Sequence, residues 1–288
     1  MKDFCVYGNP TVDLIKRPGD PELFVYGGGS YYSSLPLLER GLRVEVHAVY
    51  SPLLHAHPIS RYIVKQQFST KTNFFKIEYV DSKRIMSILE KAPPLYHWNV
   101  HNGLCHVVIN PVLGEVSASL VKAIKHKALL LAVDLQGFLR ETRGQVLVLG
   151  PSAEAIEVLR LADIVHADLE ELQALTNRHN ALEACENVVR YLRGAMLVTI
   201  RPHAAILVSE GRIRVHEFSD DYVAKERTGA GDYFLSTYTY YYVKTGDYEE
   251  SLYKAHEYVT KWLKSRDARP HRAPTTPAGV RNSLTRYH

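Results

Sequence analysis

Short apolar runs rich in β-branched residues alternate with helical patterns along most of this 288-residue chain. Several runs are apolar at consecutive positions, which is typical of strands in a parallel sheet whose two faces are both covered. The alternation predicts an α/β layered fold with a mostly parallel sheet, in which ligands gather at the carboxyl ends of the strands. The expected strands are Phe4–Tyr7, Val44–Val49, Val107–Asn110, Leu129–Asp134, Ile164–His166, Met196–Ile200 and Ala205–Val208. The expected helices are Tyr31–Arg40, Ser117–His126, Ala153–Leu161, Leu169–Thr176, Leu182–Arg193, Tyr233–Thr245 and Tyr248–Lys264.

Two segments interrupt this alternation and have the pattern of β-hairpins. Residues 14–26 contain a turn with proline and glycine, and residues 73–89 place aromatic and β-branched residues around Asp81–Ser82. Hairpins standing over the carboxyl edge of the sheet would form a small lid; the alternative is that they extend the sheet. We expect a single domain over residues 1–288, with residues 265–288 as a surface arm that holds three prolines and five arginines.

The composition excludes several classes of protein. Hydrophobic residues make up 46% and charged residues 23%, which is ordinary for a globular protein and unlike a disordered chain. The net charge of +4 belongs to residues 265–288, which carry five arginines against one aspartate, so the rest of the chain is neutral. We therefore expect no nucleic-acid partner. The chain has no apolar run long enough to span a membrane and no signal-peptide pattern, so we expect a cytoplasmic protein.

The cysteines and histidines do not form a recognisable metal motif. Cys5, Cys105 and Cys185 are far apart and include no Cys-x-x-Cys pair, so we expect buried thiols. The groups His55–His57 and 97–106 have no cysteine or carboxylate at the spacing of metal ligands, and no zinc site is expected.

The segment Thr228-Gly229-Ala230-Gly231-Asp232 precedes a long helical pattern. Small residues at this position leave the first amides of the helix uncrowded, and these amides together with the helix dipole form a site for an anion. An acid in the first turn can accept the proton of a hydroxyl nucleophile beside that anion. The alternative is a helix cap with glycines required only for packing; a Walker A loop is excluded because no Gly-Lys-Ser/Thr follows.

The chain from about Val6 to Lys264 resembles the PfkB (ribokinase-like) family of carbohydrate kinases, and Thr228–Asp232 matches the carboxyl-terminal signature of that family. The resemblance implies a ribokinase-like three-layer α/β/α fold with a small β-hairpin lid. It also implies that Asp232 is the catalytic base and that Gly229, Ala230 and Gly231 form the hole for the transferred phosphoryl group. ATP and Mg²⁺ are the implied cofactors.

The amino-terminal part of the chain also resembles this family. Residues 8–13 look like its first strand and its substrate-binding aspartate, and the glycines at 27–29 look like its substrate loop. By this resemblance Asp13, Gly28 and Gly29 bind the substrate. A carboxylate can hold two sugar hydroxyls, and glycines let the backbone approach a ligand closely. The alternatives are a turn-making aspartate and a flexible hinge.

Two further segments at strand ends carry candidate residues. In Asp168-Leu169-Glu170-Glu171 the glutamate matches a family motif linked to magnesium and phosphate, so Glu171 is the expected metal residue; the alternative is a helix cap. Residues 134–140 resemble a subgroup close to archaeal myo-inositol kinases, and there Gln136 and Arg140 would face the substrate or its phosphates. The alternative for Arg140 is a surface ion pair.

The sequence departs from the family around the nucleotide. The segment from Ile200 to Ala205 lacks the glycines that the family usually has there, and Glu226-Arg227 replaces its usual Asp-Thr. These departures put the identity of the nucleotide in doubt. The residues expected to bind it are Thr228, Asp168, Thr199, Arg201 and His256.

These observations predict a kinase that transfers phosphate to a hydroxyl of a sugar or cyclic polyol, with an inositol-like compound as the leading substrate. The alternatives are a nucleoside kinase of the same family and a non-catalytic sugar- or nucleotide-binding regulator that kept the fold. A monomer and a homodimer are both compatible with the sequence.

Overall fold

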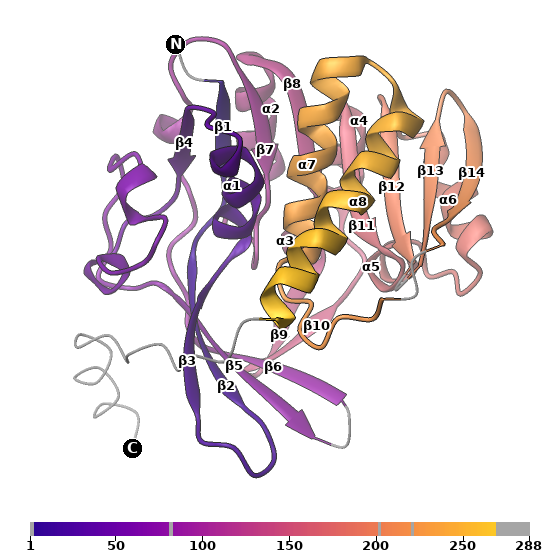
Figure 1. Ribbon diagram of the computed structural model, residues 1–288. Coiled ribbons are helices and arrows are strands. Elements are labelled where there is room, and N and C mark those ends of the chain that lie inside the picture. Colours follow the sequence, from indigo (N-terminus) through magenta and orange to yellow (C-terminus); the bar gives the residue numbers. More distant parts are fainter. Residues whose placement is uncertain (1–2, 81–82, 201–202, 220–221, 269–288) are drawn as a thin grey trace.

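The computed structural model describes residues 3–80, 83–200, 203–219 and 222–268. Its larger sheet has eight strands in the order β14-β13-β12-β11-β8-β7-β1-β4 (Figure 1). The six neighbouring strands β4, β1, β7, β8, β11 and β12 are parallel to one another. Strand β13 pairs antiparallel with β12, and β14 pairs antiparallel with β13. The strands are β1 (Phe4–Tyr7), β4 (Val44–His47), β7 (Cys105–Ile109), β8 (Ala128–Asp134), β11 (Ile164–Asp168), β12 (Ala195–Ile200), β13 (Ala204–Ser209) and β14 (Arg212–Glu217). The predicted strands are confirmed with shifts of one or two residues at their ends.

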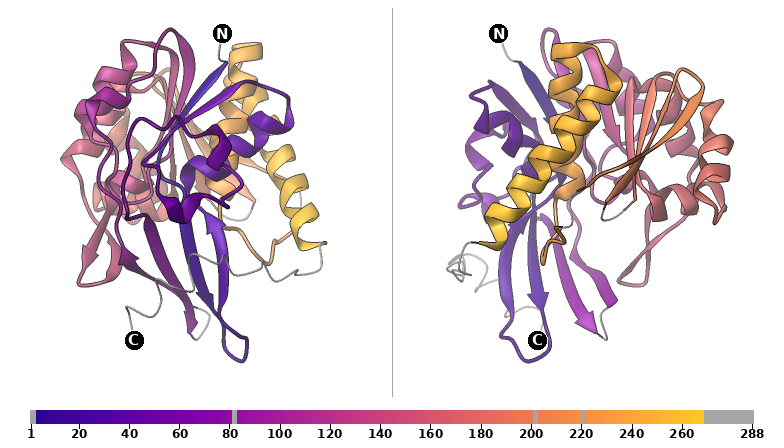
Figure 2. Two further views of the ribbon diagram at one scale, coloured as in Figure 1. Left: turned by 90° about the vertical axis from the view of Figure 1, so that its left-hand side faces the viewer. Right: turned by 45° about the vertical axis from the view of Figure 1, so that its right-hand side comes forward.

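Helices cover both faces of this sheet, as Figure 2 shows. Successive strand residues point to opposite faces, so Phe4 and Val6 pack into one core, and Cys5 and Tyr7 pack into the other. The first core lies under α1 (Gly29–Glu39), α7 (Ala230–Thr245) and α8 (Tyr248–Asp267). The second lies under α2 (Ala118–Lys125), α4 (Ala153–Leu161), α5 (Leu169–Thr176) and α6 (Ala181–Val189). The remaining helices are short: α3 (Gln136–Leu139), η1 (Pro52–Leu54), η2 (Ser60–Tyr62) and η3 (His97–Asn99).

A second sheet of six strands lies below the first in Figure 1, in the order β3-β2-β5-β6-β10-β9. Its strands are β2 (Thr11–Lys16), β3 (Leu23–Gly27), β5 (Asn73–Val80), β6 (Lys83–Glu90), β9 (Arg140–Arg143) and β10 (Val146–Leu149). Both predicted hairpins are present, and because they form a sheet of their own, the alternative that they extend the main sheet is wrong. The third hairpin, β9–β10, was not predicted. Three of the four residues of β9 are exposed, so β9 carries no apolar alternation.

The carboxyl-terminal helix is longer than the sequence indicates. Asp247 caps α8 by accepting a hydrogen bond from the Glu250 N–H (2.8 Å), and the helix continues to Asp267. Residues 265–267 of the predicted arm are therefore helical, with Lys264 and Arg266 placed favourably for the helix dipole in the last turn. The rest of the predicted arm, residues 269–288, lies outside the described residues. Helix α6, in contrast, ends at Val189 rather than at Arg193.

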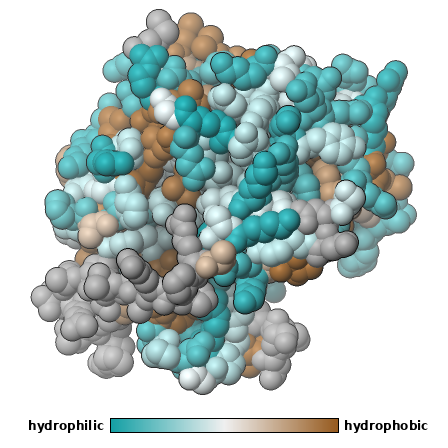
Figure 3. All heavy atoms as spheres, in the orientation of Figure 1, coloured by the Kyte–Doolittle hydropathy of each residue, from teal (hydrophilic) through white to brown (hydrophobic). Residues whose placement is uncertain are grey.

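The surface around these helices is mostly hydrophilic on the face shown in Figure 3, with smaller hydrophobic patches. Among the described residues, none of the helices combines the length and apolar character needed to cross a membrane.

Candidate active site

A pocket of about 490 Å³ opens where the carboxyl ends of the parallel strands face the small sheet. This volume is typical of a small-molecule site. Fourteen of the fifteen predicted site residues line it: Asp13, Gly28, Gly29, Gln136, Arg140, Asp168, Glu171, Thr199, Thr228, Gly229, Ala230, Gly231, Asp232 and His256. Arg201 lies outside the described residues. Residues from the small sheet, including Phe75, Tyr79 and Met86, line the same pocket, so that sheet covers the strand ends.

The amino terminus of α7 requires glycine at position 229 and leaves little room for a side chain at position 231. Gly229 has a φ of 82°, and a side chain on it would overlap the ring of Tyr32. A Cβ on Gly231 would lie 3.0 Å from Cε1 of His166. No side chain caps this helix, and its first residues, Ala230, Gly231 and Asp232, line the pocket. The packing interpretation therefore holds for Gly229, and the anion-site interpretation stays a prediction.

One of the predicted anion-hole amides is already engaged. The Ala230 N–H donates to the carbonyl of Arg227 (2.9 Å) in a turn that precedes the helix. The amides of Gly231 and Asp232 come next in the first turn, where the helix itself provides no acceptor. An anion bound in the present conformation therefore meets the Gly231 and Asp232 amides first.

Asp232 is the buried acid of this segment, with 8% of its surface exposed. Burial raises its pKa to about 7, and the nearby Asp134 carboxylate adds to that rise. The positive charges of Arg140 and His166 oppose the shift. A carboxyl group that titrates near neutral pH is suited to accept a proton from a hydroxyl.

A buried aspartate–histidine pair lies next to Asp232 and was not assigned a role from the sequence. Asp134 ends β8 and its Oδ2 lies 2.7 Å from Nδ1 of His166 on β11, both side chains being 3% exposed. The second oxygen of Asp134 accepts a hydrogen bond from the Gln136 N–H (2.8 Å). The sequence shows that both residues lie near the ends of predicted strands. That the two side chains meet is shown only by the pairing of β8 with β11 in the sheet.

The substrate-loop glycines lie against the chain around Asn9. Gly28 has a φ of 100°, and a Cβ on it would lie 2.5 Å from the Asn9 carbonyl oxygen. A Cβ on Gly29 would overlap the carbonyl of Asn110. Glycine is thus required at both positions, and this close packing opposes the hinge interpretation. Asp13, on β2, is 6% exposed and lines the pocket beside these glycines.

Asp168 and Glu171 form a reciprocal cap at the start of α5. The Glu171 N–H donates to Asp168 Oδ1, and the Asp168 N–H donates to Glu171 Oε2, both at 2.9 Å. The cap interpretation is therefore correct, yet both side chains also line the pocket. Burial raises the pKa of Glu171 well above its usual value, and the carboxylates of Asp134 and Asp168 add to the rise.

The acids Asp134, Asp168, Glu171 and Asp232 all line this pocket, and carboxylate oxygens are the kind of ligand that Mg²⁺ takes. Mutual repulsion contributes to the raised pKa values of both Glu171 and Asp232, and a bound Mg²⁺ ion would relieve that repulsion. Magnesium prefers carboxylate oxygens and retains several waters, so a partly buried pocket edge suits it.

The loop before α7 is fixed by Glu226. Its Oε1 accepts hydrogen bonds from the N–H (2.9 Å) and hydroxyl (2.6 Å) of Thr228. Its Oε2 pairs with Nη2 of Arg17 at 2.8 Å. Glu226 is a position where the sequence departs from the family. Its side chain joins Arg17, which follows β2 of the small sheet, to Thr228 just before α7.

The predicted nucleotide end of the pocket is aromatic. The rings of His256 and Phe218 stack with their centroids 3.7 Å apart and an interplanar angle of 6°. Thr199 also lines the pocket, near the end of β12, and its hydroxyl is 3.4 Å from Nε2 of His166.

Comparisons with known proteins give matches only at the level of structure. No protein-family model matches the sequence, and no curated protein matches it. A pyrophosphate-dependent kinase of the ribokinase family, solved with sulfate, matches with a TM-score of 0.81 at 20% identity, over 91% of this chain and 95% of that chain. The complex of such a kinase with a pyrophosphate analogue and myo-inositol matches with a TM-score of 0.79, at the same identity and coverage.

A ribokinase from Arabidopsis thaliana, in complex with ribose and ATP, matches with a TM-score of 0.69 at 15% identity, over 91% of this chain and 93% of that chain. The predicted fold class is confirmed: the chain has the three-layer α/β/α fold of the ribokinase-like kinases.

Proposed function

We propose that this protein is a phosphotransferase that transfers a phosphoryl group to a hydroxyl of a small cyclic polyol. The observation that carries the proposal is the position of Asp232. It is a buried acid with a pKa of about 7, in the first turn of an uncapped helix, and it lines a pocket of about 490 Å³. A base and an anion site on adjacent residues are what an in-line transfer to a hydroxyl requires.

In this reaction the ionised Asp232 accepts the proton of the substrate hydroxyl as the hydroxyl oxygen attacks the phosphorus. The Gly231 and Asp232 amides donate to the oxygens of the phosphoryl group, and the positive end of the α7 dipole offsets their charge. Rearrangement of the Arg227–Ala230 turn would add the Ala230 amide. The His166–Asp134 pair lies close to Gly231, since a Cβ on that glycine would be 3.0 Å from the His166 ring.

Asp13, the backbone of Gly28 and Gly29, and the side chains of Gln136 and Arg140, which all line the same pocket, bind the polyol. Phe75 and Tyr79 from the small sheet exclude water, which would otherwise compete with the substrate hydroxyl. Glu171 and Asp168 are the residues that would hold Mg²⁺, which neutralises charge on the phosphoryl donor when it is bound.

The donor in this proposal is ATP, and a specific observation supports a second candidate, pyrophosphate. The stacked rings of His256 and Phe218 occupy the wall where the family resemblance places adenine. Two of the matched structures are described as pyrophosphate-dependent kinases, and one of them holds a pyrophosphate analogue. Pyrophosphate is smaller than ATP, so it needs only the amides at the start of α7 and the acids Asp168 and Glu171.

The leading acceptor is an inositol-like compound. It is supported by the resemblance of residues 134–140 to the inositol-kinase subgroup and by the match to a structure that holds myo-inositol. A regulator that binds the same ligands without turnover is the rival, and the occupied Ala230 amide is the feature that favours it.

One matrix of assays tests the proposal. The full-length protein is incubated with Mg²⁺, with either ATP or pyrophosphate, and with inositols, pentoses, hexoses or nucleosides, and phosphorylated product is measured by mass spectrometry. We expect product with a cyclic polyol and one preferred donor, and no product with Asp232→Asn. Binding of an acceptor without product under every condition would support the regulator instead.

A further inference from the structure

His57 is a buried histidine whose two ring nitrogens both have backbone partners. It lies between η1 and η2, in the segment that follows β4, and 3% of its surface is exposed. Its Nδ1 accepts a hydrogen bond from the Ile59 N–H (3.2 Å), so this nitrogen carries no proton. The proton of the neutral ring is therefore on Nε2, which lies 3.1 Å from the Gly27 carbonyl oxygen and donates to it.

Burial keeps this ring neutral and in one orientation. Burial lowers the pKa of His57 to about 4, and hydrogen bonding to the backbone at Gly27 and Thr11 partly opposes the fall. The rings of Tyr26 and Tyr31 pack against the imidazole, with centroids 4.7 Å and 5.1 Å away. A neutral imidazole donates through one nitrogen and accepts through the other, which is what its two backbone contacts require.

The carbonyl that His57 holds belongs to a glycine at the edge of the substrate site. Gly27 is the last residue of β3, and it pairs with Thr11 of β2. A Cβ on Gly27 would lie 2.7 Å from Oδ2 of Asp13 and 2.9 Å from Oγ1 of Thr11. The Asp13 and Thr11 side chains therefore lie directly against this backbone, and both line the pocket.

The residue after Gly27 has a backbone conformation that needs support from its surroundings. Gly28 has φ 100° and ψ 150°, a combination that residues other than glycine rarely adopt. Its own carbonyl accepts hydrogen bonds from the N–H groups of Tyr31 and Tyr32 (3.1 Å and 3.2 Å). The bond from His57 fixes the preceding peptide, which joins Gly27 to Gly28, so both peptides beside Gly28 are held.

We propose that His57 is a positioning residue for the acceptor. Its Nε2–H holds the Gly27–Gly28 peptide, so that the substrate-loop backbone and the Asp13 carboxylate present a fixed surface to the polyol. His57 is not among the described residues that line the pocket, so it acts through Gly27 and does not touch the ligand. The inference rests on the proposed function, because it concerns the acceptor end of that site.

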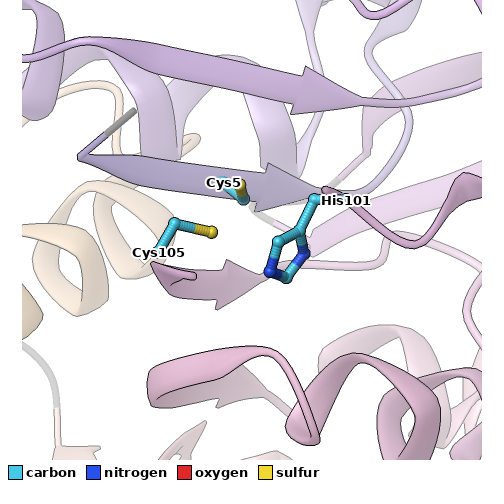
Figure 4. Close-up of side chains that lie close together, drawn as sticks. All are labelled: Cys5, His101 and Cys105. Carbon is cyan, nitrogen blue, oxygen red and sulfur yellow. The ribbon is translucent and has the colours of Figure 1, made fainter. Parts of the chain in front are cut away.

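A second buried histidine provides a matched control. His101 lies in the core close to Cys5 and Cys105 (Figure 4), and it is 1% exposed. Its ring nitrogens lie 2.9 Å from the hydroxyl of Tyr7 and 3.1 Å from a backbone carbonyl oxygen. It matches His57 in burial and in having a partner at each nitrogen, but it too is absent from the described pocket lining. Replacement of His101 therefore measures what the fold alone loses with a buried histidine.

The test compares two amides at position 57 by calorimetric titration of the full-length protein with myo-inositol. The amide nitrogen of glutamine can reach the place of the histidine Nε2, whereas that of asparagine reaches only the place of Nδ1. We expect His57→Asn to weaken binding about tenfold and His57→Gln to stay within about threefold of the wild type. His101→Asn should lower the melting temperature and leave the affinity within about twofold of the wild type.

Steady-state kinetics separates positioning from general damage to the fold. His57→Asn should raise the KM for the acceptor about tenfold and leave the KM for the phosphoryl donor within about twofold. Equal losses for both substrates, an unchanged acceptor affinity, or the same loss in His101→Asn would overturn the inference.

Two measurements test the loop without any ligand. Hydrogen exchange of peptides that cover residues 26–29 should be faster in His57→Asn than in His57→Gln or the wild type, and equal exchange in all three would overturn the inference. NMR of the wild type with nitrogen-labelled histidine needs no variant that could fail to fold, and a proton on Nδ1 of His57 would also overturn it. A wild-type protein that binds no polyol would refute the acceptor in the proposed function, while the exchange measurement would still decide whether His57 holds the loop.

Discussion

Replacement of Asp232 by asparagine is expected to stabilise the protein while it abolishes turnover. Burial raises the pKa of Asp232 from an ordinary value of 3.8 to about 7. The ionised carboxylate is therefore disfavoured in the folded state, and each pKa unit corresponds to about 1.4 kcal/mol. The three-unit difference gives about 4 kcal/mol of destabilisation at a pH well above 7, and asparagine removes it at nearly the same volume.

The sign of the pH dependence follows from proton binding. Between pH 3.8 and about 7 the folded protein keeps the Asp232 proton that the unfolded chain has lost, so this group lowers stability as the pH rises. The advantage of Asp232→Asn should be under about 1 kcal/mol near pH 4, about 2 kcal/mol near pH 5 and about 4 kcal/mol near pH 8. At roughly 2 °C per kcal/mol, the largest difference corresponds to about 8 °C in melting temperature.

The assay is thermal unfolding of both proteins across this pH range, monitored by circular dichroism. Asp3→Asn is a control of opposite sign, because the guanidinium of Arg43 lowers the pKa of Asp3 to about 2. The stabilisation that this variant loses develops between about pH 2 and pH 4, so its deficit relative to the wild type should be constant between pH 4 and pH 8, where the Asp232→Asn advantage grows. An Asp232→Asn difference that is independent of pH would refute the reasoning, because it would show that ionisation of Asp232 costs nothing in the fold.

Three further predictions concern activity. The value of kcat/KM should rise with pH through an apparent pKa near 7 and then level off, since Asp232 must be ionised to accept a proton; a flat profile would exclude it as the base. Gly229→Ala should lower kcat at least tenfold, because its Cβ overlaps Tyr32, whereas Gly246→Ala, also at positive φ but with no atom within 4 Å, should leave kcat within about twofold. Asp13→Asn should lower kcat/KM about tenfold or more through loss of charge-assisted hydrogen bonds to the acceptor, measured by steady-state kinetics, and an unchanged value would remove Asp13 from the substrate site.

Much of the site could be predicted because its residues are close in sequence or lie at strand ends. The segment 228–232 is continuous, and its chemistry follows from small residues and an acid at a helix start. The capping role of Asp168 and Glu171 was also readable, because it depends on a spacing of three residues. The pairing of Asp134 with His166 could not be predicted in this way, because the two residues lie on different strands.

Other features were hidden for different physical reasons. Strand β9 is polar and exposed and is held by backbone pairing to β10, so no hydrophobic pattern marks it. The engagement of the Ala230 amide by Arg227 depends on backbone torsions that a sequence motif does not specify.

The sequence alone determined the alternation of strands and helices, the two hairpins and the position of the acid at the start of α7. These are local properties, set by periodicity and by residues within one or two turns of each other. Only the tertiary structure decided which distant residues meet. Cys5, His101 and Cys105 look like unrelated residues along the chain, and the parallel pairing of β1 with β7 places them around one space. Strand order is fixed by packing of the whole core, so it decides which distant side chains lie together.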